Sequence, residues 1–597
     1  MAGGGARHGH KWWTMKWLRR TWPIAAAVGL LATAASAHAQ RVTVCAHGCA
    51  YREPAAAVAA ARDGDLVSLG PGSYTGGFTI DKNVTVAGAG HALTTIRGGG
   101  PVITIGVFKA TTEPVVTLRG LTITGGLTRA SEGSDYLALG GGLWIPPSAH
   151  WGVGATVTVA DSDITANTVA PRASIDAGAG VPCSDTSDCR FAQAGGGGID
   201  SWGDLTVDHS LVSDNAATGP VTSDADGAGI YGQQGTLTID SSTVAGNHST
   251  AEPPDGRFAE GAGIMFDTTF SPGKCPSAGR CRVVIRHSDV SDNRSSLATS
   301  LPAFAKGQLI ATGVNAGGIH IGDDIPVALL DSDIVDNTAT SDNPTGEATA
   351  IDAAMIVGDS PLTMRNALIS GNETSSTVAT SADIGPGGAT LELDGPGMLT
   401  RVTLLDNLST ETSSSGPAGV TGALAVFNFS GDPRLVIVRR SVITGNVAEA
   451  DSSTGTATAQ GGGVFNNSLL TMKGVLVARN LARADSPRGV AQGGGIWNGV
   501  DLSGPPVRLT LQHSAVVDNA LVAPAGSKRQ GGGLYTTSPV TLERTLIAGN
   551  QPDQCAGCST PHNAMAPDLA HRAATMHLRA PDGLATAARR AARRRSS

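Results

Sequence analysis

Residues 493–519 read GGGIWNGVDLSGPPVRLTLQHSAVVDN, and this stretch contains the two phrases from which most of the chain is built. The first phrase is a run of glycines followed by an apolar residue. The second is an alternating segment that ends in a small polar turn and an asparagine. Alternation of apolar and polar residues predicts a short β-strand, whereas the Gly and Asn residues predict turns. We therefore expect two or three short strands in each copy.

The asparagine phrase recurs along the chain at irregular spacing, which excludes arrays of fixed-length repeats and predicts one loop of variable length per repeat. Its last residue is Asn167, Asn215, Asn247, Asn293, Asn337, Asn372, Asn407, Asn446, Asn480, Asn519 and Asn550. In a coil of parallel strands, equivalent residues lie about 4.8 Å apart, so these amides can form a hydrogen-bonded ladder. The pattern favours a coil over a sandwich or a propeller, with the asparagines as turn and ladder residues rather than ligands.

Composition supports a packed, glycine-rich fold. The chain has 597 residues, of which 80 are Gly, 15% are charged and 41% are hydrophobic. This hydrophobic fraction is too high for a disordered chain, and no G-X-Y period is present, so disorder and collagen are excluded. The glycines gather in a motif with a following apolar residue, at residues 140–144, 196–200, 227–231, 261–265, 316–320, 461–465, 493–497 and 531–535.

Together the two phrases resemble the right-handed parallel β-helix of the pectin-lyase-like superfamily, especially its surface-protein branch with polymorphic outer-membrane-protein repeats. Residues 55–90, AAAVAAARDGDLVSLGPGSYTGGFTIDKNVTVAGAG, are similar to the N-terminal cap of that superfamily, in which an Ala-rich helix covers the open end of the coil. The resemblance implies an all-β fold: a single right-handed parallel β-helix (solenoid) over residues 40–558, with an N-terminal helical cap and about twelve irregular repeats.

The two ends of the chain differ from this body. Residues 1–39 have the pattern of a signal peptide, with basic residues before an apolar run and small residues at the cleavage site; Met15 is an alternative start. The apolar run is too short for a membrane anchor, so we expect no transmembrane segment after cleavage. We expect a secreted or cell-surface protein, and an Arg-rich, disordered tail over residues 559–597.

The cysteines fall in four close pairs, a pattern that favours local disulfides in an exported chain. The pairs are Cys45 with Cys49, Cys183 with Cys189, Cys275 with Cys281, and Cys555 with Cys558. No two pairs have zinc-finger spacing, so metal binding is the weaker alternative. The acidic segment 223–227 contains part of a calcium ligand set. We therefore expect no resident metal or cofactor, and leave calcium open.

The net charge of the chain at pH 7 is −8, although both of its ends are basic. The body is therefore more acidic than the chain as a whole, and an acidic surface repels polyanions. We expect no nucleic-acid partner, and strongly acidic polysaccharides are poor default ligands.

Motifs of the enzymes in this superfamily are incomplete here. Asp323–Asp324 matches one part of the polygalacturonase pattern, but the Gly-His-Gly and Arg-Ile-Lys parts are missing from the body. The Arg-x-Pro-x-x-Arg segment of pectate lyases and the Asp-Pro-His of alginate epimerases are also missing. The best acid–base candidate is His320, with Asp323 and Asp324 close in sequence and Asp267 one coil earlier. An inert histidine on an exposed loop is the competing interpretation.

The residue after each glycine-apolar motif is predicted to point away from the inside of the coil. Phe465, Trp497 and Tyr535 hold this position in consecutive coils, so their rings should form a ladder with about 5 Å between members. Exposed rings would offer a platform for sugars. Alternatively, the rings stack on one another beneath the inserted loops and stabilise the coil.

Two functions follow as hypotheses. The first is an exported, non-catalytic β-helix protein that binds a polysaccharide or a cell-surface partner through its inserted loops and its aromatic column. The second is a polysaccharide lyase or glycoside hydrolase that acts on an extracellular polysaccharide.

Overall fold

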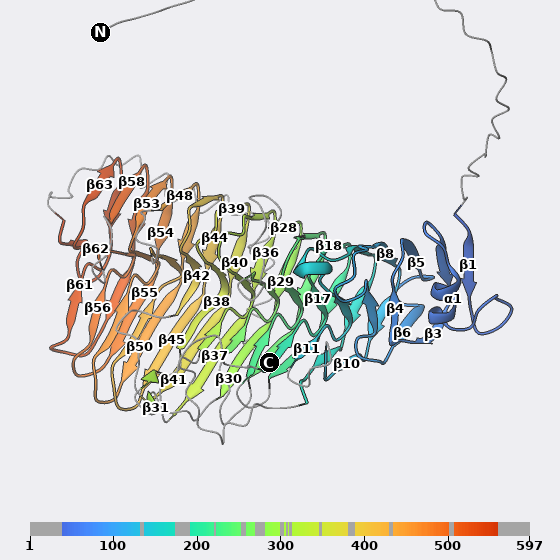
Figure 1. Cartoon of the computed structure of the whole chain (residues 1–597). Helices are drawn as coiled ribbons and strands as arrows, with labels where there is room; N and C mark the ends of the chain where they lie inside the picture. The colour runs from blue at the N-terminus through green and yellow to red at the C-terminus, as the bar shows by residue number, and fades with distance from the viewer. Residues whose placement is uncertain are drawn as a thin grey trace, which may run out of the picture. The chain divides into compact units, whose positions relative to one another are not determined.

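The fold is a right-handed parallel β-helix whose coils follow one another in chain order (Figure 1). The computed structural model describes residues 39–131, 137–172, 192–219, 223–251, 258–268, 281–298, 304–305, 308–309, 313–344, 349–379, 388–428, 434–500 and 507–558. Within these ranges, no helix has both the length and the apolar character needed to cross a membrane. The stacked parallel sheets confirm the expected parallel solenoid.

One coil illustrates the pattern of the others. It comprises β18 (Asp204–Asp208), β19 (Leu211–Ser213), β20 (Ala216–Gly219), β21 (Ser223–Asp226) and β22 (Ile230–Gly232). These strands belong to sheet A, sheet B, sheet D and, for the last two, sheet C. Each strand pairs in parallel with its equivalents in the neighbouring coils. A coil therefore has more strands than the two or three expected from the sequence.

The expected count was wrong because the alternating phrase forms two strands rather than one. In residues 236–247, β23 (Thr236–Asp240) and β24 (Thr243–Ala245) are separated by Ser241, which has a φ of 49°. A residue with positive φ turns the chain sharply, and short polar residues tolerate this conformation better than most. The corner therefore lies inside a segment whose alternation continues on both sides of it.

The asparagines form the predicted ladder. From Asn167 to Asn519, each side-chain Nδ2 donates a hydrogen bond of 2.9–3.0 Å to the Oδ1 of the asparagine in the next coil, and Asn550 is the last acceptor. The same Oδ1 also accepts a bond from the backbone N–H of the preceding asparagine. All members are at most 3% exposed. The ladder thus satisfies buried backbone donors at the turn between sheets B and D.

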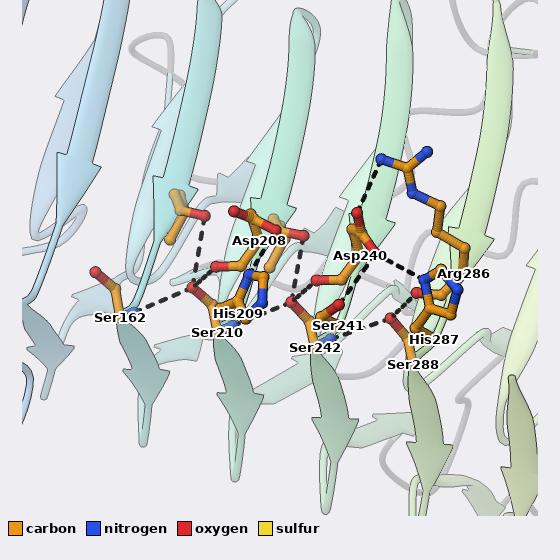
Figure 2. Close-up of polar contacts among 12 residues, drawn as sticks. Ser162, Asp208, His209, Ser210, Asp240, Ser241, Ser242, Arg286, His287 and Ser288 are labelled. Atoms are coloured by element: carbon orange, nitrogen blue, oxygen red, sulfur yellow. Dashed lines mark hydrogen bonds and ion pairs between the residues drawn. The ribbon is translucent and has the colours of Figure 1, made fainter.

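A second ladder of serine hydroxyls lies at the corner between sheets A and B (Figure 2). The backbone N–H groups of Ser162, Ser210 and Ser242 each donate to the Oγ of the serine in the next coil, at 3.0–3.1 Å. Ser288 continues the row to Ser332. The sequence analysis missed this ladder, because serine is common throughout the chain.

The main core is a continuous stack of aliphatic side chains from sheets A, B and C, as in Ile230, Leu237 and Val244. Helix α1 (Pro54–Ala60) contacts β1 (Arg41–Val44) and β2 (Leu66–Leu69) at the N-terminal end of this core, with Ala57 and Val58 buried. The predicted helical cap is therefore present.

A second, alanine-rich core separates sheet D from the first strands of sheet C. Ala225 of β21 packs there with Ala194 and Ala217, and other small residues continue the cluster in later coils. Because side chains alternate along a strand, the neighbours of these alanines point the other way, toward the second strands of sheet C. We call the space between the first and second strands of sheet C the inner angle.

Two of the expected disulfides lie in the described residues. Cys45 is bonded to Cys49, and Cys555 to Cys558. Cys281 is also disulfide-bonded. The remaining cysteines, Cys183, Cys189 and Cys275, lie outside the described residues, as do residues 1–38 of the expected signal segment and the tail 559–597.

We expect Asn446→Ala to lower the free energy of unfolding by about 3 kcal/mol or more, because buried partners in both neighbouring coils lose their hydrogen bonds. Asn446 donates to Asn480 and accepts from Asn407. Thermal and denaturant unfolding followed by circular dichroism measure the change. Asn83→Ala is the matched control, since Asn83 is exposed and its Oδ1 accepts a hydrogen bond from the backbone N–H of Val115. Equal losses in the two variants would contradict the structural role of the ladder.

Candidate functional site

The residues that follow the glycine-apolar motifs align in neighbouring coils, as predicted. Asp200 pairs with Tyr231, Tyr231 with Met265, and Met265 with His320. They point away from the main core, but Asp200, Tyr231 and Met265 are fully buried. The expectation that this column lies on an open outer surface is therefore wrong.

The column is buried because the glycine turn folds the two strands of sheet C toward each other. Gly227 has a φ of 51° between β21 and β22. The close packing that results needs a second glycine, since a Cβ on Gly195 would lie 2.6 Å from the Tyr231 ring. The column therefore lines the inner angle.

The aromatic residues form a stack in the C-terminal part of the inner angle. The ring centroids of Phe465 and Trp497 are 4.4 Å apart with nearly parallel planes, and those of Trp497 and Tyr535 are 6.4 Å apart. Phe465 is 0% and Trp497 4% exposed, whereas Tyr535 is partly exposed. This arrangement agrees with rings that stack on one another and stabilise the coil. An exposed platform of three rings is ruled out.

Amide side chains accompany this stack on a separate four-stranded sheet, which takes the place of the first strands of sheet C in these coils. Gln460 donates from Nε2 to Oε1 of Gln492 at 3.0 Å, and Gln492 donates to Gln530 in the same way. They come from β51 (Ala457–Gln460), β56 (Val490–Gln492) and β61 (Lys528–Gln530). Gln530 and Tyr535 form the accessible end of this part of the inner angle.

His320 lies on strand β34 (Ile319–Ile321), not on an exposed loop, and its side chain is only 14% exposed. Its Nδ1 is 3.6 Å from Oε2 of Glu260, on β26 (Phe258–Glu260). This is an ion-pair distance and is too long for a hydrogen bond. Asn315 holds the other oxygen of Glu260 with a hydrogen bond of 2.5 Å from Nδ2. His320 and Glu260 thus face each other across the inner angle.

Opposing effects act on the charge of His320. Burial lowers its pKa, whereas the carboxylates of Glu260, Asp267 and Asp323 raise it, and the net result is a pKa above the usual value for histidine. The imidazolium form is therefore favoured by the carboxylates around it.

Further carboxylates follow the second strands of sheet C in successive coils. Asp323 accepts a hydrogen bond of 2.9 Å from the backbone N–H of Asp359, and Asp359 forms an ion pair of 2.9 Å with Arg434. Asp394 lies directly after β42 (Ala389–Leu393). Burial and the carboxylates of Asp323 and Asp359 raise its pKa to about 7, although His320 opposes this shift.

We refer to this group as the His320 cluster, which comprises Glu260, Asp267, His320, Asp323, Asp359, Asp394 and Arg434. The structure brings together three of the four predicted residues: His320, Asp267 and Asp323. Asp324 is exposed and is not among the groups that act on His320.

The sequence analysis missed four members of the cluster: Glu260, Asp359, Asp394 and Arg434. The glycine-apolar motif, which aligned the other coils, is absent from residues 349–357 and 389–393. Only the pairing of β38 (Thr349–Val357) with β34 and β42 sets the register there.

The acidic segment that suggested calcium forms β21. Asp226 is 1% exposed and accepts a hydrogen bond of 2.9 Å from Gln193, and Gln193 also donates to the Tyr231 hydroxyl. Burial and the charges of Glu260 and Asp224 raise the pKa of Asp226 well above its usual value. A protonated carboxyl is a poor ligand for a hard cation. Among the described residues, no group of three or more His, Cys, Asp or Glu side chains could hold a metal ion.

The His320 cluster combines Asp394, whose pKa is about 7, with further carboxyl groups and with His320, whose pKa is raised. Groups of this kind can donate and accept protons, or bind a polar ligand. The coil itself does not require them, because Met265 and Ile356 fill the same position as His320 in the two neighbouring coils.

No protein-family model matches the chain, and no curated protein matches it. Among solved structures, it is similar to a PL6 family alginate lyase, AlyGC, at 10% sequence identity and a TM-score of 0.15, with 84% of this chain and 98% of that chain covered. A mutant of AlyGC matches at 10% identity and a TM-score of 0.14, with 86% and 100% covered. With such TM-scores these similarities carry no argument about the site, and the strand register of the chain itself defines the fold.

We expect Asp394→Asn to raise stability relative to the wild type more at pH 8 than at pH 4. The folded protein holds a proton on Asp394 up to about pH 7, whereas an unfolded Asp loses it near pH 4. The wild type therefore loses stability as the pH rises through this window, and the neutral asparagine does not. The melting temperatures of the wild type and the variant at pH 4 and at pH 8 measure this difference in stability. Asp342→Asn, at an exposed position, is the control. A difference that does not change with pH would contradict the raised pKa.

We expect Trp497→Ala to lower the free energy of unfolding by about 3–5 kcal/mol, because it removes a buried ring from the stack. Denaturant unfolding measures the loss. Tyr535→Ala is the comparison: its ring is partly exposed, so its removal should cost less. A loss in Trp497→Ala no larger than that in Tyr535→Ala would contradict the stabilising role of the buried stack.

Proposed function

We propose that this chain is an exported parallel β-helix protein that binds an extracellular polysaccharide, or a glycan of the cell surface, at the His320 cluster. The observation that carries the proposal is that His320 and Glu260, each 14% exposed, face each other in the inner angle, with further carboxylates directly after the second strands of sheet C. Burying such groups costs folding free energy, and the neighbouring coils use Met265 and Ile356 at the same position. A cluster that the coil does not need is best explained by a ligand.

The form of the site favours a linear polymer. Members of the His320 cluster belong to successive coils, and equivalent positions in a parallel coil repeat at about 4.8 Å. Such an array offers polar groups along a line rather than around a compact pocket. Carboxylates and Arg434 are also side chains that can hydrogen-bond sugar hydroxyls.

Export is part of the proposal. It is supported by the signal-like pattern of residues 1–39 and by the disulfides Cys45–Cys49 and Cys555–Cys558, since disulfides persist mainly in oxidising compartments.

A second candidate function is cleavage of the bound polysaccharide by a lyase or hydrolase activity. The pKa of Asp394, about 7, favours this candidate. A carboxyl that keeps its proton near neutral pH can act as a general acid, while a neighbouring ionised carboxylate acts as a base.

We expect the mature protein to bind at least one member of a panel of plant, algal and bacterial polysaccharides, measured by affinity electrophoresis. His320→Ala and Asp394→Asn should each weaken this binding by about tenfold or more, because they remove polar contacts in the cluster. Asp324→Asn is the matched control: this exposed Asp lies beside the cluster and has a φ of 59°, which asparagine tolerates.

Turnover is measured on the same panel as new reducing ends or unsaturated products. Turnover that His320→Ala or Asp394→Asn abolishes would establish the enzymatic candidate. Binding without turnover would support the non-catalytic binding protein. If the wild type binds none of the polysaccharides, or if Asp324→Asn weakens binding as much as the cluster variants, the proposal is wrong.

A further inference from the structure

Exposed basic side chains form a row along the corner between sheets A and B, in the C-terminal half of the coil. Its members are Arg365, Arg401, Arg439, Arg440, Lys473 and Arg544. We call this row the basic corner. Each member is either the last residue of a sheet A strand, as in β39 (Leu362–Arg365), β48 (Leu435–Arg439) and β53 (Leu469–Lys473), or lies directly after that strand. The row belongs to a different face from the inner angle of sheet C.

Strand register places Arg365, Arg401, Arg439, Arg440 and Lys473 in four successive coils. The next coil has Gln512 and His513 at this corner, and Arg544 lies one coil further on, beside Glu543. Arg439 pairs with Lys473, and the coil before Arg439 has Thr400 in this position, followed by Arg401 at the corner. The backbone N–H of Arg401 donates to the carbonyl of Arg439, and that of Arg440 to the carbonyl of Lys473. Since neighbouring strands are about 4.8 Å apart, the cations follow one another along a line.

This row is an unfavourable arrangement for the isolated protein. Like charges on adjacent strands destabilise a sheet. In addition, Arg401, Arg440 and Arg544 have φ values of 56°, 51° and 47°, a left-handed conformation that Gly, Asn, Asp and His adopt more readily than Arg. Residues of those favoured types occupy much of the same corner in the N-terminal half, as at Gly120, Asp161, His209, His287 and Asp331.

Charge pairing also differs between the two halves of the corner. In the N-terminal half, Asp240 forms ion pairs with Arg286 at 2.8 Å and with His287 at 3.2 Å, as Figure 2 shows. In the C-terminal half, Arg439, Arg440 and Lys473 form no ion pair with any residue that the structure describes. Their charges are therefore available to an external anion.

We propose that the basic corner binds a linear polysaccharide that carries sulfate groups. The guanidinium group presents a planar fork of donors that fits a tetrahedral oxyanion, and five of the six members are arginines. A regular line of cations fits a polymer with regularly placed charges. Arg439 and Arg440 lie in one coil, which suits a sulfated polymer with more than one charge per sugar.

The observations favour a polysaccharide over a nucleic acid. Single-stranded nucleic acids bind where aromatic rings stack on the bases, and the members of the basic corner include no aromatic residue. The net charge of −8 also means that most of the protein repels a polyanion. Binding of the polyanion is therefore confined to this corner. The expectation that strongly acidic polysaccharides are poor ligands applies to the rest of the surface and not to the basic corner.

The test compares dextran sulfate with unsubstituted dextran by isothermal titration calorimetry at low and high salt. Wild-type protein should bind only dextran sulfate, and more weakly as salt rises, because bound counterions are released. The triple variant Arg439→Gln, Arg440→Gln, Lys473→Gln should lose about tenfold or more in affinity and show a shallower salt dependence. The control variant Arg129→Gln, Arg282→Gln, Arg294→Gln removes the same charge from exposed positions elsewhere and should lose less than about twofold.

Circular dichroism and melting temperature establish that both variants are folded. The proposal is wrong if the two variants lose affinity equally, if wild type does not distinguish dextran sulfate from dextran, or if single-stranded DNA of equal charge binds as tightly. This test is independent of the His320 cluster, because His320→Ala should leave the affinity for dextran sulfate unchanged. If His320→Ala also loses affinity for dextran sulfate, the basic corner is not a separate binding site.

Discussion

The amide ladder at the turn between sheets B and D sets the register on which the rest of the structure depends. Each of its asparagines donates to one neighbour and accepts from the other, and also receives a backbone N–H. A shift of one residue in any coil would leave a buried amide without partners and move core side chains to the wrong face. The ladder therefore locks the alternation of side chains in every strand that follows it.

Because the ladder fixes one point in each coil, the segments between ladder residues are free to differ in length. The entropy cost of closing a longer loop rises only slowly with its length. This explains how coils with irregular spacing between asparagines retain the same strand pairing from β13 (Thr156–Ala160) to β63 (Val540–Glu543). Inserted residues can then differ between coils without disturbing the core.

The second, alanine-rich core has a chemical consequence. Small side chains allow sheet D and the first strands of sheet C to pack closely, so the other side of those strands faces the inner angle. Polar groups there are shielded from water, which strengthens interactions between charges. The raised pKa values of Asp394 and Asp226 follow from that shielding and from neighbouring carboxylates. At the basic corner, by contrast, the charges face solvent.

Much of the fold could be predicted from the sequence, because its signals are local. Alternation specifies strands, asparagine specifies the ladder turn, and the Ala-rich segment between β1 and β2 specifies the cap. The corner at Ser241 was missed because a short polar residue with positive φ leaves the alternation on both sides intact. Glu260 and Asp394 were missed because the motif that aligns other coils is absent near Asp394, and nothing local marks Glu260 as facing His320.

The sequence by itself thus determined that this chain is a parallel coil with an asparagine ladder, a helical cap and an aromatic column in consecutive coils. Only the tertiary structure decided that the column is buried, that His320 faces Glu260, and that Arg439 and Lys473 belong to one row. The physical reason is that periodicity records which face of a strand a side chain occupies. What lies opposite that face depends on how a glycine turn folds the chain back, and on register across loops of unequal length.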